Sequence, residues 1–503
     1  MSMIQVEHLT FCYDGGIEPV FEDVSFVIDT DWKLGLTGRN GRGKTTLLKL
    51  LAGEYKYSGS IRASVEMDCF PFPVGNMSAN VIDVIEEADP SYELWKVCRE
   101  LTCLDMDPEI LYRPFDTLSG GEQTRVMLAA LFARENAFLL IDEPTNHLDM
   151  EARESLMKYL RGKKGFILVS HDRYFLDGCV DHILAINRRN MEVVRGDFTT
   201  WEAEKAKKDA FELGENERLK KDIRRLEAAA ARTERWSAAV EKTKKGAGAG
   251  GLKPDRGFVG HRAAKMMKRS KNIESRMRSA AEEKRKLLKN VETAEELKIC
   301  PLIHHKRRLV QMEDVTLSYG ERTVLEKWSM HIDQGERVLL AGGNGSGKST
   351  VLRAILGAAS GEDTCLAGGR IDLAPGLVLS YVPQDPGGLS GNLRDLARER
   401  GMDLTLFMAL LRKMDFSRLQ FEKPMEDYSL GQKKKVLLAA SLSRQAHLYI
   451  WDEPMNYIDI FSRGQIAGLI QKYSPTMLLV EHDRAFAEEV STRRIRLSSR
   501  SSD

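Results

Sequence analysis

Two short glycine-rich segments of this 503-residue chain carry the residue types that bind phosphate groups. Both fit the pattern G-x-x-x-x-G-K-[ST], in which backbone N–H groups surround phosphates and the lysine reaches the β- and γ-phosphates. These phosphate loops span residues 38–45 and 342–349. The hydroxyl group after each lysine, on Thr45 or Ser349, is predicted to bind Mg²⁺. The pattern predicts nucleotide contacts at Gly38, Asn40, Gly41, Gly43, Lys44, Thr45 and Thr46, and at Gly342, Asn344, Gly345, Gly347, Lys348, Ser349 and Thr350.

An acidic pair follows each phosphate loop, at the end of an apolar strand. The pairs are Asp142-Glu143 and Asp452-Glu453. An aspartate in this place suits the coordination of Mg²⁺ through the waters of the metal. The adjacent glutamate suits the orientation or deprotonation of an attacking water molecule. We therefore predict metal contacts at the two aspartates and catalytic roles for the two glutamates.

An isolated histidine follows a further apolar strand in each half of the chain. His171 lies 28 residues after Glu143, and His482 lies 29 residues after Glu453. A lone histidine after a strand usually has a structural role. The repeated order instead favours contact of each histidine with a γ-phosphate, so both are predicted to be catalytic.

These landmarks recur at a nearly constant offset, which indicates a duplicated domain of about 200 residues. The lysines of the phosphate loops are 304 residues apart, the glutamates 310 and the histidines 311. Each phosphate loop must lie between a strand and a helix. We expect the strands at residues 34–37 and 337–341, and the helices at residues 45–51 and 350–356.

The segment between the two copies differs from them in composition. Residues 201–300 contain 27 Lys and Arg against 17 Asp and Glu, a net charge of +10, whereas the whole chain carries +1. Apolar residues recur at helical spacing in 201–242 and 261–297, and a glycine-rich stretch covers 243–260. This pattern predicts two long helices in an antiparallel hairpin. The alternative is a solvated, partly disordered charged linker.

The basic charge of the linker is typical of a partner that carries phosphate groups, such as RNA. Binding of this kind weakens steeply as the salt concentration rises. The alternative is a helical face that is merely solvated. Leu252, Phe258 and Val259 are apolar residues in the glycine-rich stretch. They are candidates for contact with tRNA or a base, or they cap the hairpin.

The overall composition is that of an ordinary globular protein with two or three domains. Hydrophobic residues make up 42% and charged residues 30% of the chain. No apolar run reaches the roughly 18 residues of a membrane span, and the N-terminus lacks the features of a signal peptide. Seven cysteines without a C-x-x-C motif favour free thiols in a reducing compartment. We therefore expect a cytoplasmic protein.

Leu118-Ser-Gly-Gly-Glu122, followed by Glu143-Pro-Thr-Asn-His-Leu-Asp149, resembles the signature and acidic motifs of ABC ATPases. In that family two nucleotide-binding domains enclose two ATP molecules head to tail. The resemblance implies a site one, with Lys44, Glu143 and the second signature near Ser429, and a site two, with Lys348, Glu453 and the first signature. The implied signature contacts are Ser119, Gly120, Gly121 and Glu122, with Ser429, Gly431 and Gln432 in the second copy. Gln384 is implied at the metal, and Tyr13 and Tyr319 as adenine-stacking residues; buried strand tyrosines are the alternative.

Two departures from the family pattern both fall in site one. Leu430 replaces a glycine of the second signature, where a side chain crowds the close approach of the backbone to the γ-phosphate. Phe72 stands where the family has a glutamine, which the second copy retains as Gln384. Phenylalanine contacts neither Mg²⁺ nor water. We therefore predict slower hydrolysis in site one.

Five further segments resemble the Lsa-type antibiotic-resistance proteins of the ABC-F subfamily. The segments are residues 32–46, 135–149, 209–213, 262–271 and 448–454, and the similarity covers the whole chain. The resemblance implies an α/β fold with two tandem ABC-type P-loop ATPase domains. These domains would occupy residues 1–198 and 303–503, joined by a long α-helical hairpin at residues 199–302. It also implies Mg²⁺-dependent hydrolysis of ATP to ADP and phosphate.

By the same resemblance, the partner is the ribosome. The hairpin would enter the ribosomal E site, with 23S rRNA and the P-site tRNA near its tip. The protein would relieve inhibition by lincosamides, streptogramin A compounds and pleuromutilins, and so confer antibiotic resistance. Two ATP sites within one chain imply a monomer. The alternatives are a housekeeping ABC-F translation factor and the tandem ATPase subunit of an ABC importer.

Overall fold

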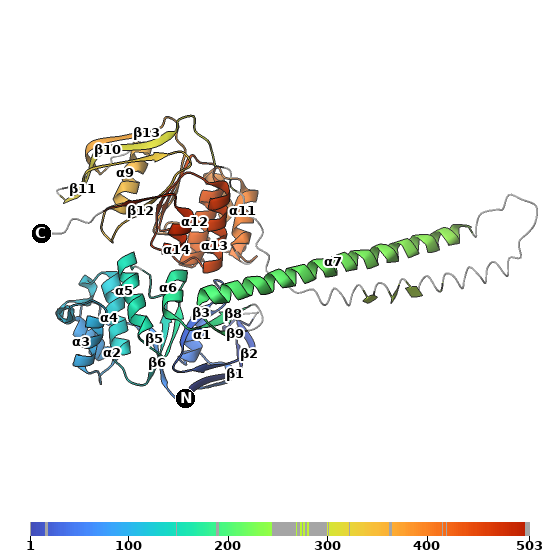
Figure 1. Ribbon diagram of the computed structural model, residues 1–503, viewed down its shortest axis with the longest axis horizontal. Helices are drawn as coiled ribbons and strands as arrows, with labels where there is room; N and C mark the ends of the chain where they lie inside the picture. The colour runs from blue at the N-terminus through green and yellow to red at the C-terminus, as the bar shows by residue number, and fades with distance from the viewer. Residues whose placement is uncertain are drawn as a thin grey trace, which may run out of the picture. The chain divides into compact units, whose positions relative to one another are not determined.

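The computed structural model describes residues 2–15, 19–146, 148–187, 191–243, 301–320, 322–361, 365–414, 416–418 and 420–497, with a few isolated residues between 268 and 299. The chain divides into two compact units. The first unit joins Met1–Trp201 to Ala294–Asp503, and the second is Glu202–Thr293. Figure 1 shows the first unit as two mixed α/β domains and the second around the long helix α7.

A six-stranded sheet forms the centre of the first domain. In spatial order it contains β5 (Glu66–Phe70), β6 (Ala137–Asp142), β7 (Phe166–Val169), β3 (Lys33–Thr37), β8 (His182–Ile186) and β9 (Met191–Arg195). All neighbours are parallel except β8 and β9, which are antiparallel. Parallel strands end at the same edge of a sheet. The phosphate loop after β3, the acidic pair after β6 and the histidine after β7 therefore meet at one edge.

The second domain repeats this sheet with five parallel strands. In spatial order they are β14 (Leu379–Val382), β15 (Leu448–Asp452), β16 (Met477–Val480), β12 (Arg337–Ala341) and β17 (Arg493–Arg496). The predicted strand at residues 337–341 is confirmed, and the strand predicted at 34–37 begins one residue earlier as β3. The duplication inferred from the spacing of the motifs is therefore a duplication of the fold.

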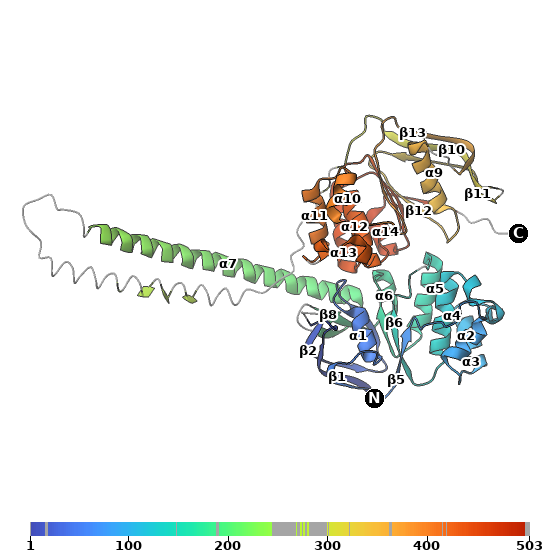
Figure 2. The ribbon, with the colours of Figure 1, turned by 180° about the vertical axis from the view of Figure 1, so that it is seen from behind.

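Each domain also has a three-stranded antiparallel sheet. One contains β2 (Phe21–Asp29), β1 (Met3–Phe11) and β4 (Ser58–Arg62), and the other contains β11 (Arg322–Asp333), β10 (Arg308–Tyr319) and β13 (Leu366–Leu373). Figure 2 shows α9 close to β10, β11 and β13, with α10 to α13 gathered elsewhere in the second domain.

Helices cover both faces of each central sheet. In the first domain they are α1 (Lys44–Leu51), α2 (Val81–Ala88), α3 (Leu94–Cys103), α4 (Gly120–Phe132), α5 (Met150–Arg161) and α6 (Arg173–Cys179), with the short helices η1 (Pro108–Tyr112) and η2 (Phe115–Thr117). In the second domain they are α9 (Lys348–Ser360), α10 (Leu393–Glu399), α11 (Leu404–Lys413), α12 (Leu430–Ser443), α13 (Ile460–Tyr473) and α14 (Arg484–Val490), with η3 (Gln420–Glu422) and η4 (Met425–Asp427). The helices predicted after the phosphate loops are confirmed as α1 and α9.

Alternate residues of the strand before each acidic pair belong to different hydrophobic cores. Leu139 and Ile141 of β6 pack in the core built with α2 to α6, whereas Phe138 and Leu140 pack in the core built with α1, β1 and β2. A parallel strand covered on both faces reads as a continuous apolar run, as this one does. The acidic pair of the first domain therefore follows four consecutive buried residues of β6.

The first arm of the predicted hairpin is the single helix α7, which spans Phe198–Thr243. The apolar tip residues Leu252, Phe258 and Val259 lie outside the described residues, as does most of the second arm. The hairpin and the domain boundaries at 198 and 302 remain predictions. Within the described part of the chain, the structure contains no helix with the length and hydrophobicity of a membrane span.

A buried carboxylate connects α3 to the helix that follows the acidic segment of the first domain. Glu100 is 1% exposed, and it accepts hydrogen bonds from Tyr159 Oη at 2.7 Å, from Arg99 at 2.9 Å and from Lys163. Burial alone would raise the pKa of Glu100. Hydrogen bonds from Lys163, Tyr159 and Arg99 outweigh burial and lower the pKa below its ordinary value. These contacts hold α5 in place, and α5 begins next to Asp149.

We predict that Lys163→Met lowers the free energy of unfolding at pH 7 by about 1–3 kcal/mol, because a buried acceptor loses a charged donor. Since the pKa of Glu100 is lowered by folding, its contribution is complete above the unfolded pKa of about 4.3 and is lost as the pH falls further. The difference between variant and wild type should therefore shrink below about pH 4 in chemical denaturation. Lys164→Met is the matched control; an equal loss from the control would contradict the prediction.

Candidate functional site

Both phosphate loops hold their lysine over the loop's own backbone. Lys44 Nζ donates to Gly38 O at 2.8 Å and to Asn40 Oδ1 at 3.3 Å. Lys348 Nζ donates to Gly342 O and Gly343 O, both at 2.8 Å. Each ammonium group thus lies over its own loop, whose backbone N–H groups are the ones predicted to surround phosphate.

The glycine before each lysine is required by its conformation and by its neighbours. Gly43 has φ 86° and Gly347 has φ 93°, in the left-handed region that favours glycine. A Cβ atom at Gly43 would lie 2.6 Å from Val20 Cγ1, and one at Gly347 would lie 2.7 Å from Val324 Cγ1. A side chain at either position would therefore clash with Val20 or Val324, which would have to move.

The residues predicted to contact the metal lie together in both domains. Thr45 Oγ1 donates to Asp142 Oδ2 at 2.7 Å, and Ser349 makes a hydrogen bond with Asp452. Burial raises the pKa of both aspartates. Among the described residues, Asp452 Oδ1 is buried without a hydrogen-bond partner. A hydroxyl beside a carboxylate fits Mg²⁺, which prefers oxygen ligands and is usually held by one or two carboxylates together with phosphates. When bound, Mg²⁺ would neutralise charge on the phosphates.

The two predicted catalytic glutamates have the same strained backbone. Glu143 follows β6 with φ 52°, and Glu453 follows β15 with φ 46°. Their N–H groups donate to Val169 O and Val480 O, each at 2.9 Å. Non-glycine residues with positive φ are uncommon, and strain of this kind is typical of functional sites. Here it fixes the direction of each glutamate relative to the strand ends.

Each predicted histidine faces its glutamate. His171 Nε2 lies 3.3 Å from Glu143 Oε1, and His482 Nε2 lies 3.4 Å from Glu453 Oε1. Burial and the nearby positive charges of Lys44 and Arg463 lower the pKa of His171 well below its ordinary value, so its ring is neutral. Within the described part of the chain, Glu143 Oε1 and His482 Nε2 are buried without a hydrogen-bond partner. Unpartnered groups of this kind suit a water molecule or a γ-phosphate oxygen.

The two glutamates differ in the hydrogen bonds that offset their burial. Burial acts to raise the pKa of Glu453, but the ring of His482, 3.4 Å away, and hydrogen bonds with Gln384 and Asn456 lower it to about 2. Asn456 Nδ2 donates to Glu453 Oε2 at 2.7 Å. Glu453 is therefore an ionised carboxylate, which is the state that a general base needs.

Glu143 has the opposite protonation state. Burial and the neighbouring charge of Asp142 raise its pKa to about 8, although the positive charges of Lys44 and Arg463 oppose this. Phe72, which stands where Gln384 stands in the second domain, packs against the apolar core instead. The carboxyl group of Glu143 is therefore mainly protonated near neutral pH. The pKa values of the two glutamates thus differ in the direction expected for slower hydrolysis at site one.

Both signature segments begin helices, as the family resemblance implied. Ser119 caps α4 and Ser429 caps α12, and each forms a reciprocal capping box with the third residue of its helix, Glu122 or Gln432. The exposed N-terminus of a helix with a serine hydroxyl favours anions. Gly120 and Gly121 lie in the first turn of α4, and Gly431 lies in the first turn of α12.

Each phosphate loop contacts the other domain. Asn40 Nδ2 donates to Tyr457 O at 3.0 Å, and Asn344 N donates to Asp149 Oδ2 at 3.3 Å. An added Cβ at Gly431 would lie 3.5 Å from Asn40 Nδ2. The second signature therefore meets the first phosphate loop, as expected for site one. The approach of Ser119 to Lys348 in site two remains a prediction.

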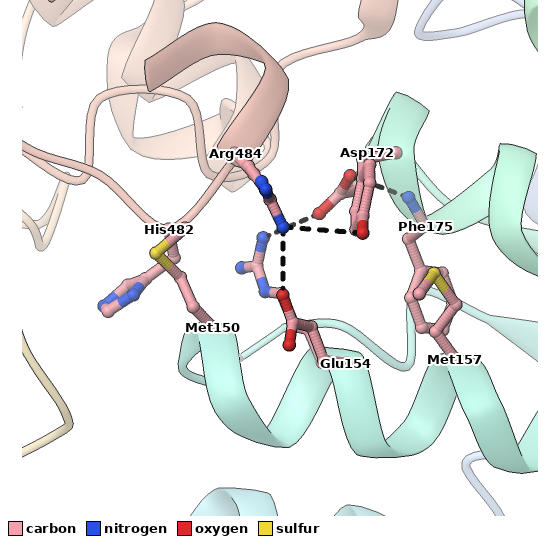
Figure 3. Close-up of a pocket in the computed structure, with 9 residues that line it drawn as sticks. Met150, Glu154, Met157, Asp172, Phe175, His482 and Arg484 are labelled. Carbon is pink, nitrogen blue, oxygen red and sulfur yellow. Dashed lines mark hydrogen bonds and ion pairs between the residues drawn. The ribbon is translucent and has the colours of Figure 1, made fainter. Parts of the chain in front are cut away.

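A small pocket beside His482 holds an ion pair between the domains. Figure 3 shows Arg484 reaching Glu154, and the two side chains are 3.1 Å apart. Arg484 also lies over the ring of Tyr174, 5.0 Å from its centroid. The equivalent position in the other half is occupied by Gly464, where an added Cβ would lie 3.0 Å from Arg173 Nη2. The carboxylate of this pair is therefore present on one side of the molecule and replaced by glycine on the other.

The tyrosines implied to stack on adenine are half-exposed. Tyr13 and Tyr319 are each 46% exposed, so the alternative of buried strand tyrosines is wrong. Tyr13 Oη is 2.7 Å from Thr46 Oγ1, and Tyr319 Oη accepts a hydrogen bond from Arg353 at 3.3 Å. Both rings thus lie beside the helix that follows a phosphate loop, and stacking on a base remains a prediction.

Sequence reasoning missed several residues that complete the sites. They are Asn456, which binds Glu453, Tyr457, which meets Asn40, and Lys434 and Lys435 in α12. The position of Asn456 and Tyr457 could have indicated their role, because both lie between Glu453 and Asp459, the residue that matches Asp149. Nothing in the sequence distinguishes Lys434 and Lys435 from solvent-exposed lysines after a signature motif.

Paired phosphate loops, acidic strand ends and serine-capped helices that meet across domains define a tandem P-loop ATPase. The chain belongs to the ABC transporter family, whose pattern matches residues 21–146 and 325–456. The predictions of two tandem ABC domains and of an ATPase are confirmed.

Similar proteins match nearly the whole chain. Ribosome protection protein VmlR of Bacillus subtilis (strain 168) is 28% identical over 506 residues, covering 97% of this chain and 85% of the relative. Energy-dependent translational throttle protein EttA of Haemophilus influenzae is 26% identical over 528 residues, covering 94% and 88%. These matches support the predicted ABC-F subfamily. In fold, the chain resembles the archaeal ribosome recycling factor aABCE1, solved with stalk protein aP1, with a TM-score of 0.62 at 21% identity over 97% of this chain and 87% of that one.

We predict that Glu453→Gln lowers steady-state ATP turnover by about 10²-fold or more, since it removes an ionised general base. Glu143→Gln should lower turnover less than about threefold, because Glu143 is largely uncharged before the change. Phe72→Gln supplies the missing hydrogen-bond donor of site one. In the Glu453→Gln background it should raise the residual turnover. Equal losses from the two Glu→Gln variants would contradict the predicted difference.

Proposed function

We propose that this protein is an ATP-driven ribosome-binding protein of the ABC-F type. The observation that carries the proposal is the similarity to VmlR over 97% of the chain, which includes the interdomain segment as well as the ATPase domains. The name of that relative states ribosome protection, and the name of EttA states a role in translation. An ATPase that works on ribosomes in the cytoplasm agrees with both.

The chemistry of the interdomain segment supports an RNA partner. The 46 residues of α7 extend for about 70 Å, which is long enough to reach deep into a large assembly. The segment 201–300 has a net charge of +10. Cationic side chains bind RNA mainly by neutralising phosphates, so the interaction depends on salt. The sites for ATP would then control whether this arm is presented to the ribosome.

In the proposed cycle, ATP binds with both phosphate loops closed against the opposite domain. Glu453 orients and deprotonates water at site two, while Glu143 turns over more slowly at site one. Closure would present the linker to the E site, near 23S rRNA and the P-site tRNA. Hydrolysis at site two would then release the contacts between the phosphate loops and the opposite domain and free the protein.

We also propose that the protein relieves the inhibition of ribosomes by antibiotics bound at the peptidyl transferase centre. Lincosamides, streptogramin A compounds and pleuromutilins are the proposed classes, on the strength of the Lsa-type resemblance and of the similarity to VmlR. The similarity to EttA favours a second candidate, a housekeeping translation factor that also binds ribosomes.

We expect the Glu143→Gln/Glu453→Gln double variant to sediment with ribosomes only in the presence of ATP, because it binds ATP and fails to reset. Sedimentation should fall steeply across a salt series, as phosphate neutralisation requires. Lys44→Ala/Lys348→Ala, which lacks the phosphate-binding ammonium groups, is the matched control and should stay in the supernatant. A double variant that stays in the supernatant with ATP at low salt would overturn ribosome binding.

Drug susceptibility separates the two candidate functions. Expression in a susceptible bacterium should raise the inhibitory concentration of at least one of the three drug classes, measured by growth in a dilution series. The Glu143→Gln/Glu453→Gln variant should give no protection. Unchanged susceptibility to all three classes, together with ATP-dependent sedimentation, would favour the housekeeping role.

A further inference from the structure

Near its N-terminus, helix α12 contacts parts of both ATP sites. It begins at the second signature, where Gly431 lies against Asn40 of the first phosphate loop and against Tyr457 O, which would be 2.8 Å from an added Cβ. Residues three and four positions apart lie on the same face of a helix. Lys434 and Lys435 therefore continue the face of α12 that Gly431 presents to site one.

Lys434 directs its ammonium group to the catalytic segments of site two. The residue is fully buried, and Nζ donates to Pro383 O at 2.8 Å, to Gln384 O at 3.0 Å and to Asp452 O at 3.4 Å. An ammonium group has three donors, and three backbone carbonyls use them here. Gln384 binds Glu453 through its side chain, and Asp452 binds Ser349. One side chain thus anchors both segments that hold the proposed base and the metal site.

Lys435 directs its ammonium group to the segment of the second domain that faces site one. Its Nζ lies 2.9 Å from Asp459 Oδ2, and both side chains are buried. Asp459 caps α13 by accepting from Ser462 N at 2.9 Å. Two positions before it, Tyr457 O receives the hydrogen bond from Asn40. A movement of the first phosphate loop would therefore reach α12 by two routes. One is the direct contact with Gly431, and the other runs through Tyr457 and the ion pair between Asp459 and Lys435.

The first domain lacks the residue that makes this connection. Thr124 matches Lys434 and Arg125 matches Lys435, at the same offset of 310 as the acidic pairs. Threonine has no ammonium group and is too short to span three carbonyls. Arg125 donates to Gly121 O of α4 at 3.3 Å and to Leu104 O, just after α3, at 3.4 Å. Both contacts lie within the first domain.

We propose that Lys434 is a positioning residue that transmits the closure of site one to the catalytic groups of site two, and that Thr124, at the matching place in α4, cannot do the same in the opposite direction. A rigid helix that touches both sites supplies the physical route. The inference rests on the proposed ranking of the two sites, in which site two carries most of the turnover. It concerns the ATPase alone and does not depend on the ribosome as the partner.

The test is a double-mutant cycle between Lys44→Ala, which empties site one, and Lys434→Met, measured as ATP turnover of the full chain. We expect each single change to lower kcat about tenfold, with KM for ATP changed less than about twofold by Lys434→Met. In the Lys434→Met background, Lys44→Ala should lower kcat by less than about threefold more, because the route is already broken. If the two effects multiply, site one acts on site two by another route and the proposal is overturned.

Three controls separate positioning from a general structural role. Lys433→Met changes the adjacent, partly exposed lysine and should leave turnover and the cycle unchanged. Lys434→Arg keeps the charge and should restore part of the coupling. If Lys434→Met does not fold, as judged by its thermal unfolding, Lys434→Gln replaces it in the cycle, with the same two outcomes. Comparison of Glu143→Gln with Glu453→Gln tests separately whether site two carries most of the turnover. A wrong ranking of the two sites can therefore be distinguished from the absence of coupling through Lys434.

Discussion

Burial of carboxylates at the ends of parallel strands is the constraint on which both ATP sites depend. Strands β6 and β15 run through the apolar core and end in an acidic pair, so Glu143 and Glu453 both lose water. Burial disfavours a charged carboxylate, and the cost must be offset by donors or cations. At Glu453, the ring of His482 and the hydrogen bonds with Gln384 and Asn456 offset it and keep the carboxylate ionised. At Glu143, the positive charges of Lys44 and Arg463 offset it only in part. The two glutamates thus share a backbone conformation but differ in protonation state.

The fold and the motifs could be predicted from the sequence because both depend on local patterns. Apolar runs placed the strand at 337–341 at its observed bounds and the strand at 34–37 within one residue, and the glycine pattern placed both phosphate loops. The protonation states could not be predicted, since they depend on tertiary neighbours. Gln384 reaches Glu453 from 69 residues earlier in the chain. Lys434 reads as a solvated charge in a basic run, and only the packing of α12 shows that it is buried.

The contacts between domains show the same divergence after duplication. Each phosphate loop keeps a hydrogen bond to the other domain, through Asn40 in one half and Asn344 in the other. Around these shared contacts the charged pairs differ. Glu154 pairs with Arg484 on one side, whereas Gly464 occupies the matching place on the other. An exposed ion pair contributes only about 0–1 kcal/mol.

Two differences between the domains affect the polar groups that connect the signature helix of a domain to its own acidic pair. In the first domain, Phe72 stands where the second domain has Gln384, which binds Glu453. Thr124 stands where the second domain has Lys434, which anchors the segment of Gln384. Both losses are in the first domain. The second domain therefore keeps a continuous polar connection from its signature helix to Glu453, its predicted base, whereas the first domain has Thr124 and Phe72 at the two matching positions. Since the second signature meets the first phosphate loop, closure at site one can act on hydrolysis at site two through α12. In α4, Thr124 leaves no ammonium group to form the reverse connection.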